Sequence, residues 1–217
     1  RLAAIAIADV VGYSRLMGVD EAGTLARLNA RRTELIEPQV QSHGGRVVKL
    51  LGDGFFIEFG SAVDALEAAL AIQAGMSEAN AALPAQLRML LRVGINLGEV
   101  IVAGEDLFGD GVNVAARLES IAPRGGIALS GSIYEQVRGR VEVEFEDSGE
   151  QALKNIASPV RVYTISPLAI GMAEAAAPMA APAPRQEMPA PKPVAAPVAA
   201  EPAAPVAGLL CADTPAF

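Results

Sequence analysis

Two spacings of apolar residues divide the first 165 positions of the chain into strands and helices. Residues 2–8 form a continuous apolar run that ends at Asp9, a pattern typical of a strand buried on both faces. Residues 20–42 place apolar side chains at helical spacing, and His43-Gly44-Gly45 ends this predicted helix. Its apolar face is expected to contain Leu25, Leu28, Leu35 and Ile36.

The following segment predicts a hairpin and then a long helix. Strands over 46–51 and 55–59 are joined by Gly52-Asp53-Gly54, a hairpin turn signature. Ser61 is placed to cap a helix that runs to about residue 82. Strands are also predicted over 86–96, 99–103, 126–129, 141–145 and 160–165, with a Gly- and Asp-rich loop over 104–111 and a helix over 112–121. This order predicts an α+β fold with a ferredoxin-like βαββαβ core and additional αβ elements.

The composition changes sharply after residue 166. Residues 167–217 hold 11 of the 15 prolines, most of them within Ala/Pro-rich stretches. Such a segment has few large apolar side chains and cannot offset the entropy of ordering. We therefore expect a folded domain over residues 1–166 and a disordered linker or tail over residues 167–217.

Charge and residue content narrow the possible functions. A net charge of −8 disfavours a nucleic-acid-binding protein, which needs a basic face. The single cysteine, Cys211, and the single histidine, His43, exclude an internal disulfide, a cysteine zinc site and a histidine-based triad. The sequence contains neither an apolar run of membrane-spanning length nor a signal-peptide pattern. We expect a cytoplasmic domain with no membrane segment within this chain.

Two aspartates are candidates for a metal-binding site. Asp9 follows the first buried strand, and Asp53 lies in the hairpin turn. If these strands are neighbours, both carboxylates emerge at the same end of the sheet, where they suit Mg²⁺ or Mn²⁺. Taken alone, Asp53 is an ordinary turn residue. The short loop over 10–14 could offer backbone N–H groups to phosphate oxygens.

Four segments together resemble the catalytic domains of class III adenylyl and guanylyl cyclases. They are IADVVGYSRLM at 7–17, VVKLLGDGFFIEF at 47–59, LRVGINLGEVIVAG at 91–104 and EDLFGDGVNVAARLES at 105–120. The similarity covers about residues 3–165 and is greatest to soluble bacterial members, including those of rhizobial type.

The resemblance implies a role for each matching position. Asp9 and Asp53 match the two aspartates that bind two Mg²⁺ or Mn²⁺ ions. Lys49 and Asp106 match the pair that reads the purine base. Asn113 and Arg117 match the catalytic residues that orient the ribose and stabilise the transition state. Beside these positions, the residues themselves indicate a phosphate-binding loop formed by Val10, Val11, Gly12, Tyr13 and Ser14. Some members place a phosphate-binding lysine near 147–150; here the nearest cation is Lys154.

These residue types suit ATP. A lysine donates to a purine ring nitrogen, and a carboxylate accepts from the exocyclic amine of adenine but faces an oxygen in guanine. In this family one subunit supplies the metal-binding aspartates and the other supplies the base-reading and catalytic residues. The resemblance therefore implies a homodimeric adenylate cyclase that forms 3′,5′-cyclic AMP and pyrophosphate.

Three alternatives are considered. The first is a guanylate cyclase, and the second is a catalytically silent module that dimerises and binds nucleotide. The presence of both aspartates, Asn113 and Arg117 argues against the silent module. The third is an enzyme of the diguanylate-cyclase or polymerase-palm type, which shares paired carboxylates on a ferredoxin-like core. The sequence lacks the Gly-Gly-acidic-acidic-Phe hairpin of that type.

Overall fold

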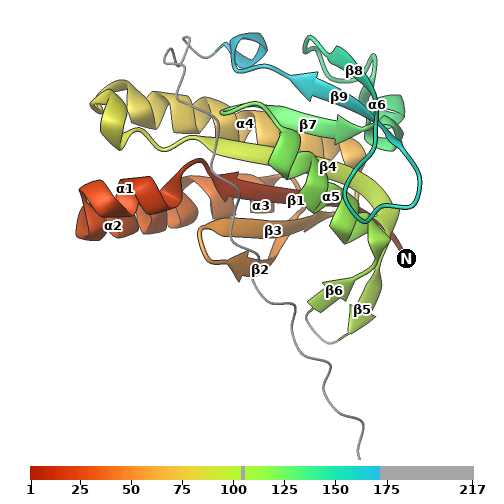
Figure 1. The fold of residues 1–217 in the computed structure, drawn as a ribbon, viewed down its shortest axis with the longest axis horizontal. Coiled ribbons are helices and arrows are strands. Elements are labelled where there is room, and N and C mark those ends of the chain that lie inside the picture. The colour runs from red at the N-terminus through yellow and green to blue at the C-terminus, as the bar shows by residue number, and fades with distance from the viewer. Residues whose placement is uncertain (104–105, 172–217) are drawn as a thin grey trace, which may run out of the picture. The chain divides into compact units, whose positions relative to one another are not determined.

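The framework of the domain is a mixed seven-stranded sheet (Figure 1). The computed structural model describes residues 1–103 and 106–171. The strand order is β2-β3-β1-β4-β7-β9-β8. The strands are β1 (Leu2–Val10), β2 (Arg46–Leu51), β3 (Gly54–Phe59), β4 (Leu91–Glu99), β7 (Ile127–Ser130), β8 (Glu146–Gln151) and β9 (Val160–Ile165). A separate hairpin pairs β5 (Ile101–Ala103) with β6 (Asp106–Phe108).

The first four strands confirm the predicted ferredoxin-like core. β1 lies between β3 and β4 and runs antiparallel to both, and β2 pairs with β3. β1 is buried from Ala3 to Ala8, as its continuous apolar run predicts. The added strands β7, β9 and β8 extend the sheet beyond β4, where β4 and β7 are parallel.

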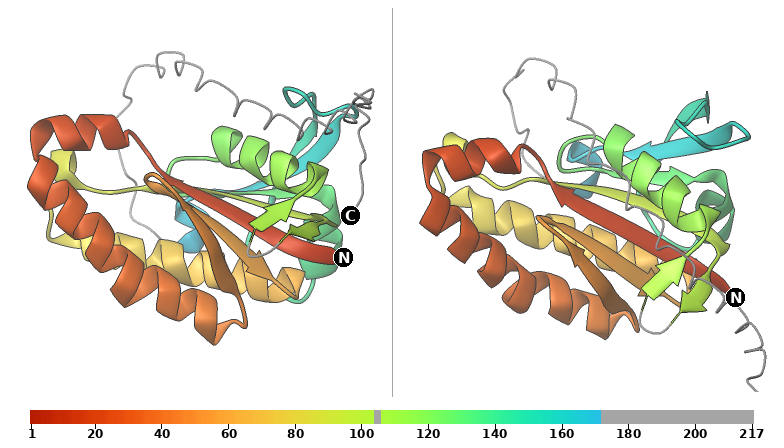
Figure 2. Two further views of the ribbon diagram at one scale, coloured as in Figure 1. Left: turned by 90° about the horizontal axis from the view of Figure 1, so that it is seen from below. Right: turned by 60° about the horizontal axis from the view of Figure 1, so that its bottom comes forward.

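Helices cover both faces of the sheet (Figure 2). One face packs against α1 (Tyr13–Val19), α2 (Glu21–Arg31), α3 (Glu37–Ser42), α4 (Ala62–Ala81) and α6 (Gly131–Val137). On the opposite face lies α5 (Asp110–Ile121), which contacts β4, β1 and β7. Ser61 caps α4 as predicted, because its hydroxyl accepts hydrogen bonds from the N–H groups of Val63 and Asp64.

The predicted helix over 20–42 is helical throughout but contains a π turn over Arg32–Ile36. Pro38 explains the irregularity, since it has no N–H to donate to the carbonyl of Glu34. Within this turn the N–H of Glu37 donates to the carbonyl of Arg32, five residues back, where a regular α-helix would use the carbonyl four residues back. The expected position of Leu25 on the apolar face is wrong, because its side chain is 49% exposed.

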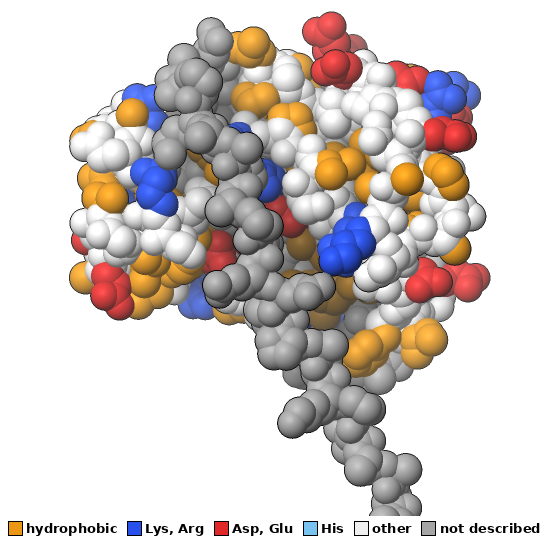
Figure 3. All heavy atoms as spheres, viewed as in Figure 1, with side chains coloured by type: hydrophobic (Ala, Val, Ile, Leu, Met, Phe, Trp, Pro, Cys, Tyr) orange, Lys and Arg blue, Asp and Glu red, His pale blue; other side chains and the backbone are white. Residues whose placement is uncertain are grey.

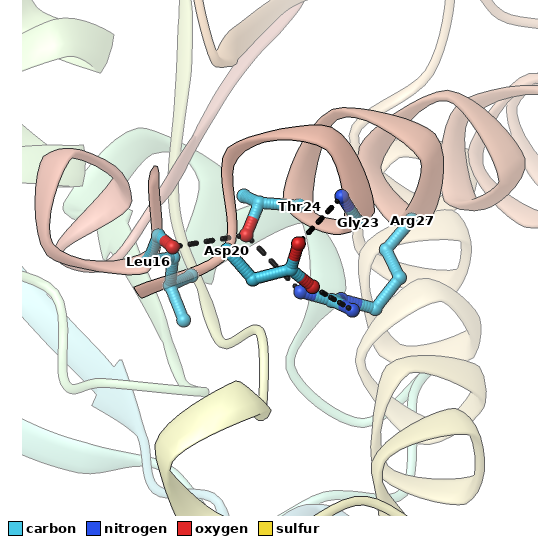
Figure 4. A network of polar contacts seen from close by, with 5 residues as sticks. All are labelled: Leu16, Asp20, Gly23, Thr24 and Arg27. Atoms are coloured by element: carbon cyan, nitrogen blue, oxygen red, sulfur yellow. Dashed lines mark hydrogen bonds and ion pairs between the residues drawn. The ribbon is translucent and has the colours of Figure 1, made fainter. Parts of the chain in front are cut away.

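The connection between α1 and α2 explains why Leu25 is exposed (Figure 4). Thr24 takes the buried position in the first turn of α2, and its hydroxyl donates to the Leu16 carbonyl of α1. Asp20 caps α2 by accepting from the N–H of Gly23, and Arg27 donates to both Asp20 and Thr24. The hydrogen bond that Asp20 accepts from the Gly23 N–H is the main cause that lowers the pKa of its carboxyl below the ordinary value of 3.8, and the bond from Arg27 lowers it further.

Other sequence predictions need correction. Part of the loop expected over 10–14 belongs to α1, a seven-residue helix whose N-cap, Gly12, provides no side-chain hydrogen bond. The strand predicted to begin at residue 86 begins at Leu91, after a 3₁₀ turn over Ala85–Leu87. The loop predicted over 104–111 contains β6 and the start of α5.

The strand predicted over 141–145 is also wrong. Val141, Val143 and Phe145 pack against the core without joining the sheet, and the ladder to β9 begins at Glu146. This strand, β8, is polar because it forms the edge of the sheet and exposes most of its side chains. Arg161 of β9 donates to Asp147 of β8 and sets the register beside the bulge.

The predicted domain boundary after residue 166 stays a prediction. Residues Leu168–Ile170 form a 3₁₀ turn in which Ala169 and Ile170 pack against the core. The rest of the predicted tail, including Cys211, lies outside the described residues.

Candidate active site

The two aspartates singled out by the sequence lie at the same end of the sheet. Ala8 of β1 lies opposite Phe55 of β3, so Asp9 is level with the start of β3, directly after Asp53. A Cβ atom placed on Gly54 would lie 3.3 Å from the Asp9 Oδ1 atom and 3.0 Å from the Ala8 carbonyl oxygen. The Asp9 carboxylate therefore lies against the backbone of the residue that follows Asp53. Glycine at position 54 favours this close approach, because a Cβ there would be in tight contact with both atoms.

The donor set fits a hard divalent cation. Asp9 and Asp53 are both half-buried and supply carboxylate oxygens. Among residues 1–103 and 106–171, no cluster of three or more His, Cys, Asp or Glu side chains could hold a metal by itself. Mg²⁺ commonly uses one or two carboxylates and completes its octahedron with water and substrate phosphates. Asp9 and Asp53 would hold such ions only together with a phosphate-bearing substrate.

The loop that follows Asp9 has a defined conformation. The N–H of Val11 donates to the Leu90 carbonyl at 2.8 Å, so this amide is already used within the protein. Gly12 adopts φ 67°, a left-handed conformation that favours glycine. The amides at the start of α1, which follow Gly12, have no acceptor within their own helix. The part of the predicted loop suited to phosphate oxygens is therefore Gly12, Tyr13 and Ser14.

The structure adds a cation that the sequence reasoning missed. Arg92 of β4 lies directly opposite Asp9 in the β1–β4 ladder. The Arg92 Nε atom is buried, and within the part of the chain that the structure describes it has no hydrogen-bond partner. A partly buried guanidinium across the ladder from Asp9 suits an anionic group bound with the cations. The signal in the sequence was the arginine that stands between the apolar residues Leu91 and Val93 at the start of β4.

Lys49 and Asp106 belong to neighbouring elements. Lys49 is exposed on β2 and lies opposite Phe56 of β3, whose ring belongs to the apolar cluster on the α5 side of the sheet. β6 contacts β2, and the backbone of Asp106 pairs with Ala103 in the β5–β6 hairpin. The side chain of Asp106 lies outside the described part, so its predicted pairing with the base stays a prediction.

Asn113 and Arg117 occupy one side of α5, as their spacing predicts. Asn113 is exposed and Arg117 is half-buried. The Arg117 Nε atom donates to the Lys154 carbonyl at 3.1 Å, so the structure brings these two predicted residues together through the backbone of Lys154. The predicted phosphate contact of the Lys154 side chain stays a prediction.

This fold is that of a nucleotidyl cyclase domain. Residues 2–167 match the family model of the adenylate and guanylate cyclase catalytic domain. The chain therefore belongs to that family, and the resemblance recognised in the sequence is confirmed.

Individual relatives agree with this assignment. The chain is 54% identical over 167 residues to a putative adenylate cyclase 3 of Rhizobium meliloti, across 77% of this chain and 28% of that protein. It is 34% identical over 137 residues to an adenylate cyclase of Streptomyces coelicolor, across 63% of this chain and 34% of that protein. A solved adenylate/guanylate cyclase/hydrolase from Silicibacter pomeroyi superposes with a TM-score of 0.73 at 43% identity, covering 77% of this chain and 97% of that one. The matched region spans about a third or less of these two curated relatives.

Proposed function

We propose that this domain converts ATP into 3′,5′-cyclic AMP and pyrophosphate at a site shared between two copies of the chain. The observation that carries the proposal is the placement of Asp9 against the Gly52-Asp53-Gly54 turn, with Arg92 directly across the ladder. Two carboxylates, an arginine and the amides that follow Gly12 form a site for a metal–polyphosphate group. Relatives named as adenylate cyclases support the choice of ATP.

The proposed reaction forms one bond and breaks one bond. The ribose 3′ oxygen attacks the α-phosphorus and gives its proton to water, while the bond from that phosphorus to the oxygen bridging to the β-phosphate breaks and pyrophosphate leaves. Two divalent cations, when bound, lower the pKa of the attacking hydroxyl and offset charge on the leaving oxygen. Asp9 and Asp53 would hold these cations, Arg92 and the loop would bind the triphosphate, Asn113 would orient the ribose, and Arg117 would offset charge at the α-phosphate.

The surface of the domain supports a dimer. Ile101 and Phe108 form a cross-strand pair on the β5–β6 hairpin, and their side chains are 69% and 55% exposed. Leu50 and Leu51 at the end of neighbouring β2 are also exposed. Apolar side chains gathered on two adjoining elements favour burial against another protein surface. A second copy would cover them and bring α5 of one chain to the aspartates of the other.

The same surface gives no comparable support for nucleic acid as a partner. On the face drawn in Figure 3, lysine and arginine side chains are interspersed with acidic and apolar ones. No helix in the described ranges is long and apolar enough to cross a membrane. A cytoplasmic location stays a prediction from the sequence.

The first test measures cyclic nucleotide formation by the full chain with ATP or GTP, and with Mg²⁺ or Mn²⁺, over a range of protein concentrations. We expect cyclic AMP, at a specific rate that rises with concentration as dimers form. Cyclic GMP as the main product would favour a guanylate cyclase. A folded dimer that gives neither product would support the catalytically silent module instead.

The second test separates the two halves of the shared site. Asp9→Ala and Arg117→Ala should each be inactive alone, and an equal mixture should regain about a quarter of the wild-type activity. Random pairing makes half of the dimers mixed, and each mixed dimer has one intact site of two. A mixture that stays inactive although mixed dimers form would contradict the shared site.

The third test concerns base choice. Exchanging Lys49 and Asp106 for residues that accept from the guanine N–H groups and donate to its carbonyl oxygen should move the ratio of kcat/KM values toward GTP. An unchanged preference for ATP would show that other residues read the base.

A further inference from the structure

We infer that Asn96 is a positioning residue that fixes helix α5, and with it Asn113 and Arg117, on the sheet. This inference rests on the proposed function, because it concerns how that site is assembled. Asn96 lies in β4 within the run Gly94-Ile95-Asn96-Leu97-Gly98. It was not among the residues that the sequence singled out, and its side chain does not belong to the substrate site described above.

The strand presents two glycines and one asparagine to α5. Residues 94, 96 and 98 alternate with the buried side chains of Val93 and Ile95, which face the opposite core. A Cβ on Gly94 would lie 2.1 Å from the Glu119 nitrogen and 2.4 Å from the Ala115 carbonyl oxygen. The helix backbone therefore rests directly on the strand at Gly94.

The second glycine makes the same kind of contact at the other end of the helix. A Cβ on Gly98 would lie 2.9 Å from the Cα atom of Gly111. Since Gly111 is the second residue of α5, this close approach sets where the helix begins. The two glycines determine how closely α5 packs against the sheet, but they form no side-chain hydrogen bond that would hold the helix in one orientation.

Asn96 supplies that bond between the two glycines. Its Nδ2 atom donates to the Gly111 carbonyl at 3.0 Å, and its side chain is 6% exposed. The bonded carbonyl is two residues before Asn113 and six before Arg117. Because a buried amide that loses its acceptor is costly, this bond opposes sliding or rotation of the first turn of α5. Asn96 would thus act on the reaction only through the helix that carries Asn113 and Arg117.

The test uses the two halves of the shared site. Asn96→Ala should lower kcat on the order of 10- to 100-fold with a smaller change in KM for ATP, because a misplaced catalytic group affects mainly the transition state. Mixed with Asp9→Ala, it should regain about a quarter of the wild-type activity, since the Asp9→Ala chain then contributes an intact α5. Mixed with Arg117→Ala, it should show no gain, because both chains then have a defective α5.

Two further variants keep the result interpretable. Gly98→Ala would crowd both the Gly111 Cα atom at 2.9 Å and the Asn96 Nδ2 atom at 3.2 Å, and should behave like Asn96→Ala in both mixtures. Asn80→Ala is the matched control: Asn80 is a buried asparagine of α4 that bonds the Met89 backbone in both directions. Its loss should lower stability without the pattern of half-site rescue.

The outcomes are distinct. If Asp9→Ala and Arg117→Ala fail to rescue each other, the shared site of the proposed function has failed, whatever Asn96 does. If they do rescue each other, the inference about Asn96 is overturned by wild-type kcat in Asn96→Ala. It is equally overturned if both mixtures of Asn96→Ala behave alike, or if only Arg117→Ala rescues it.

Discussion

Gly94→Ala is the substitution whose effect can be worked out most directly from the structure. The added methyl would lie 2.1 Å from the Glu119 nitrogen and 2.4 Å from the Ala115 carbonyl oxygen, where ordinary contacts begin at 3.4 Å. Both contacts are with helix backbone, so no side-chain rotation can relieve them. Helix α5 would have to move away from β4 by roughly 1 Å, a change of the overpacking kind.

The expected cost has two parts. Overpacking of this kind destabilises by about 1–3 kcal/mol, which should appear as a lower midpoint of urea unfolding. Arg117 lies between Ala115 and Glu119 on the displaced segment, and a shift of about 1 Å at a catalytic group can cost about 100-fold in rate. We therefore expect kcat for cyclic AMP formation to fall on the order of 100-fold under conditions in which the variant is fully folded.

The assay compares steady-state kinetics with circular dichroism and dimer content for each variant. Gly60→Ala is the matched control, since a Cβ there meets no atom within 4 Å and its φ is not positive. It should leave kcat and unfolding unchanged. A folded, dimeric Gly94→Ala protein with wild-type kcat would refute the idea that the packing position of α5 against β4 determines the reaction rate.

Three other predictions concern separate parts of the domain. Arg92→Ala should raise KM for ATP on the order of tenfold through loss of a charge-assisted contact, and Arg92→Lys should restore part of it. Ser61→Ala should lower the free energy of unfolding by about 1 kcal/mol through loss of the α4 cap and leave kcat unchanged. Asp20→Asn should destabilise the domain at neutral pH. Because the pKa of Asp20 is lowered in the folded state, its contribution is present above its ordinary value of 3.8 and is lost as pH falls below it.

A specific result would contradict each of these three predictions. An unchanged KM in Arg92→Ala would remove Arg92 from the triphosphate site. Equal unfolding midpoints for wild type and Ser61→Ala would show that water replaces the cap without loss. For Asp20→Asn, urea unfolding at pH 7 and pH 3 should give a difference from wild type that shrinks at the lower pH, and a constant difference would contradict the assigned titration.

The sequence alone determined the core of the fold and most of the candidate site. The apolar run before Asp9, the Gly52-Asp53-Gly54 turn and the cap at Ser61 depend on local conformational preferences, which neighbouring residues express directly. Asp9 and Asp53 could be placed together because the ends of paired strands share one edge of a sheet. The family, too, could be recognised from four short segments in the right order.

The tertiary structure decided features that depend on contacts distant in sequence. Helix α1 has Gly12 at its N-cap, which provides no side-chain hydrogen bond, so its stability comes from packing of Leu16 and from the hydrogen bond of the Thr24 hydroxyl to the Leu16 carbonyl. The same bond placed Thr24, rather than Leu25, on the buried face. β8 is a polar edge strand whose pairing with β9 determines its bounds, whereas the apolar alternation that precedes it only packs against the core.

The roles of Arg92 and Asn96 also depended on the tertiary structure. Arg92 is 83 positions from Asp9 in the sequence, and only the register of β1 with β4 places them opposite each other. Asn96 and Gly111 are joined across the gap between a strand and a helix, where two glycines let the backbones approach. Sequence periodicity describes which face a residue occupies, but the partner on that face is decided by how the elements pack.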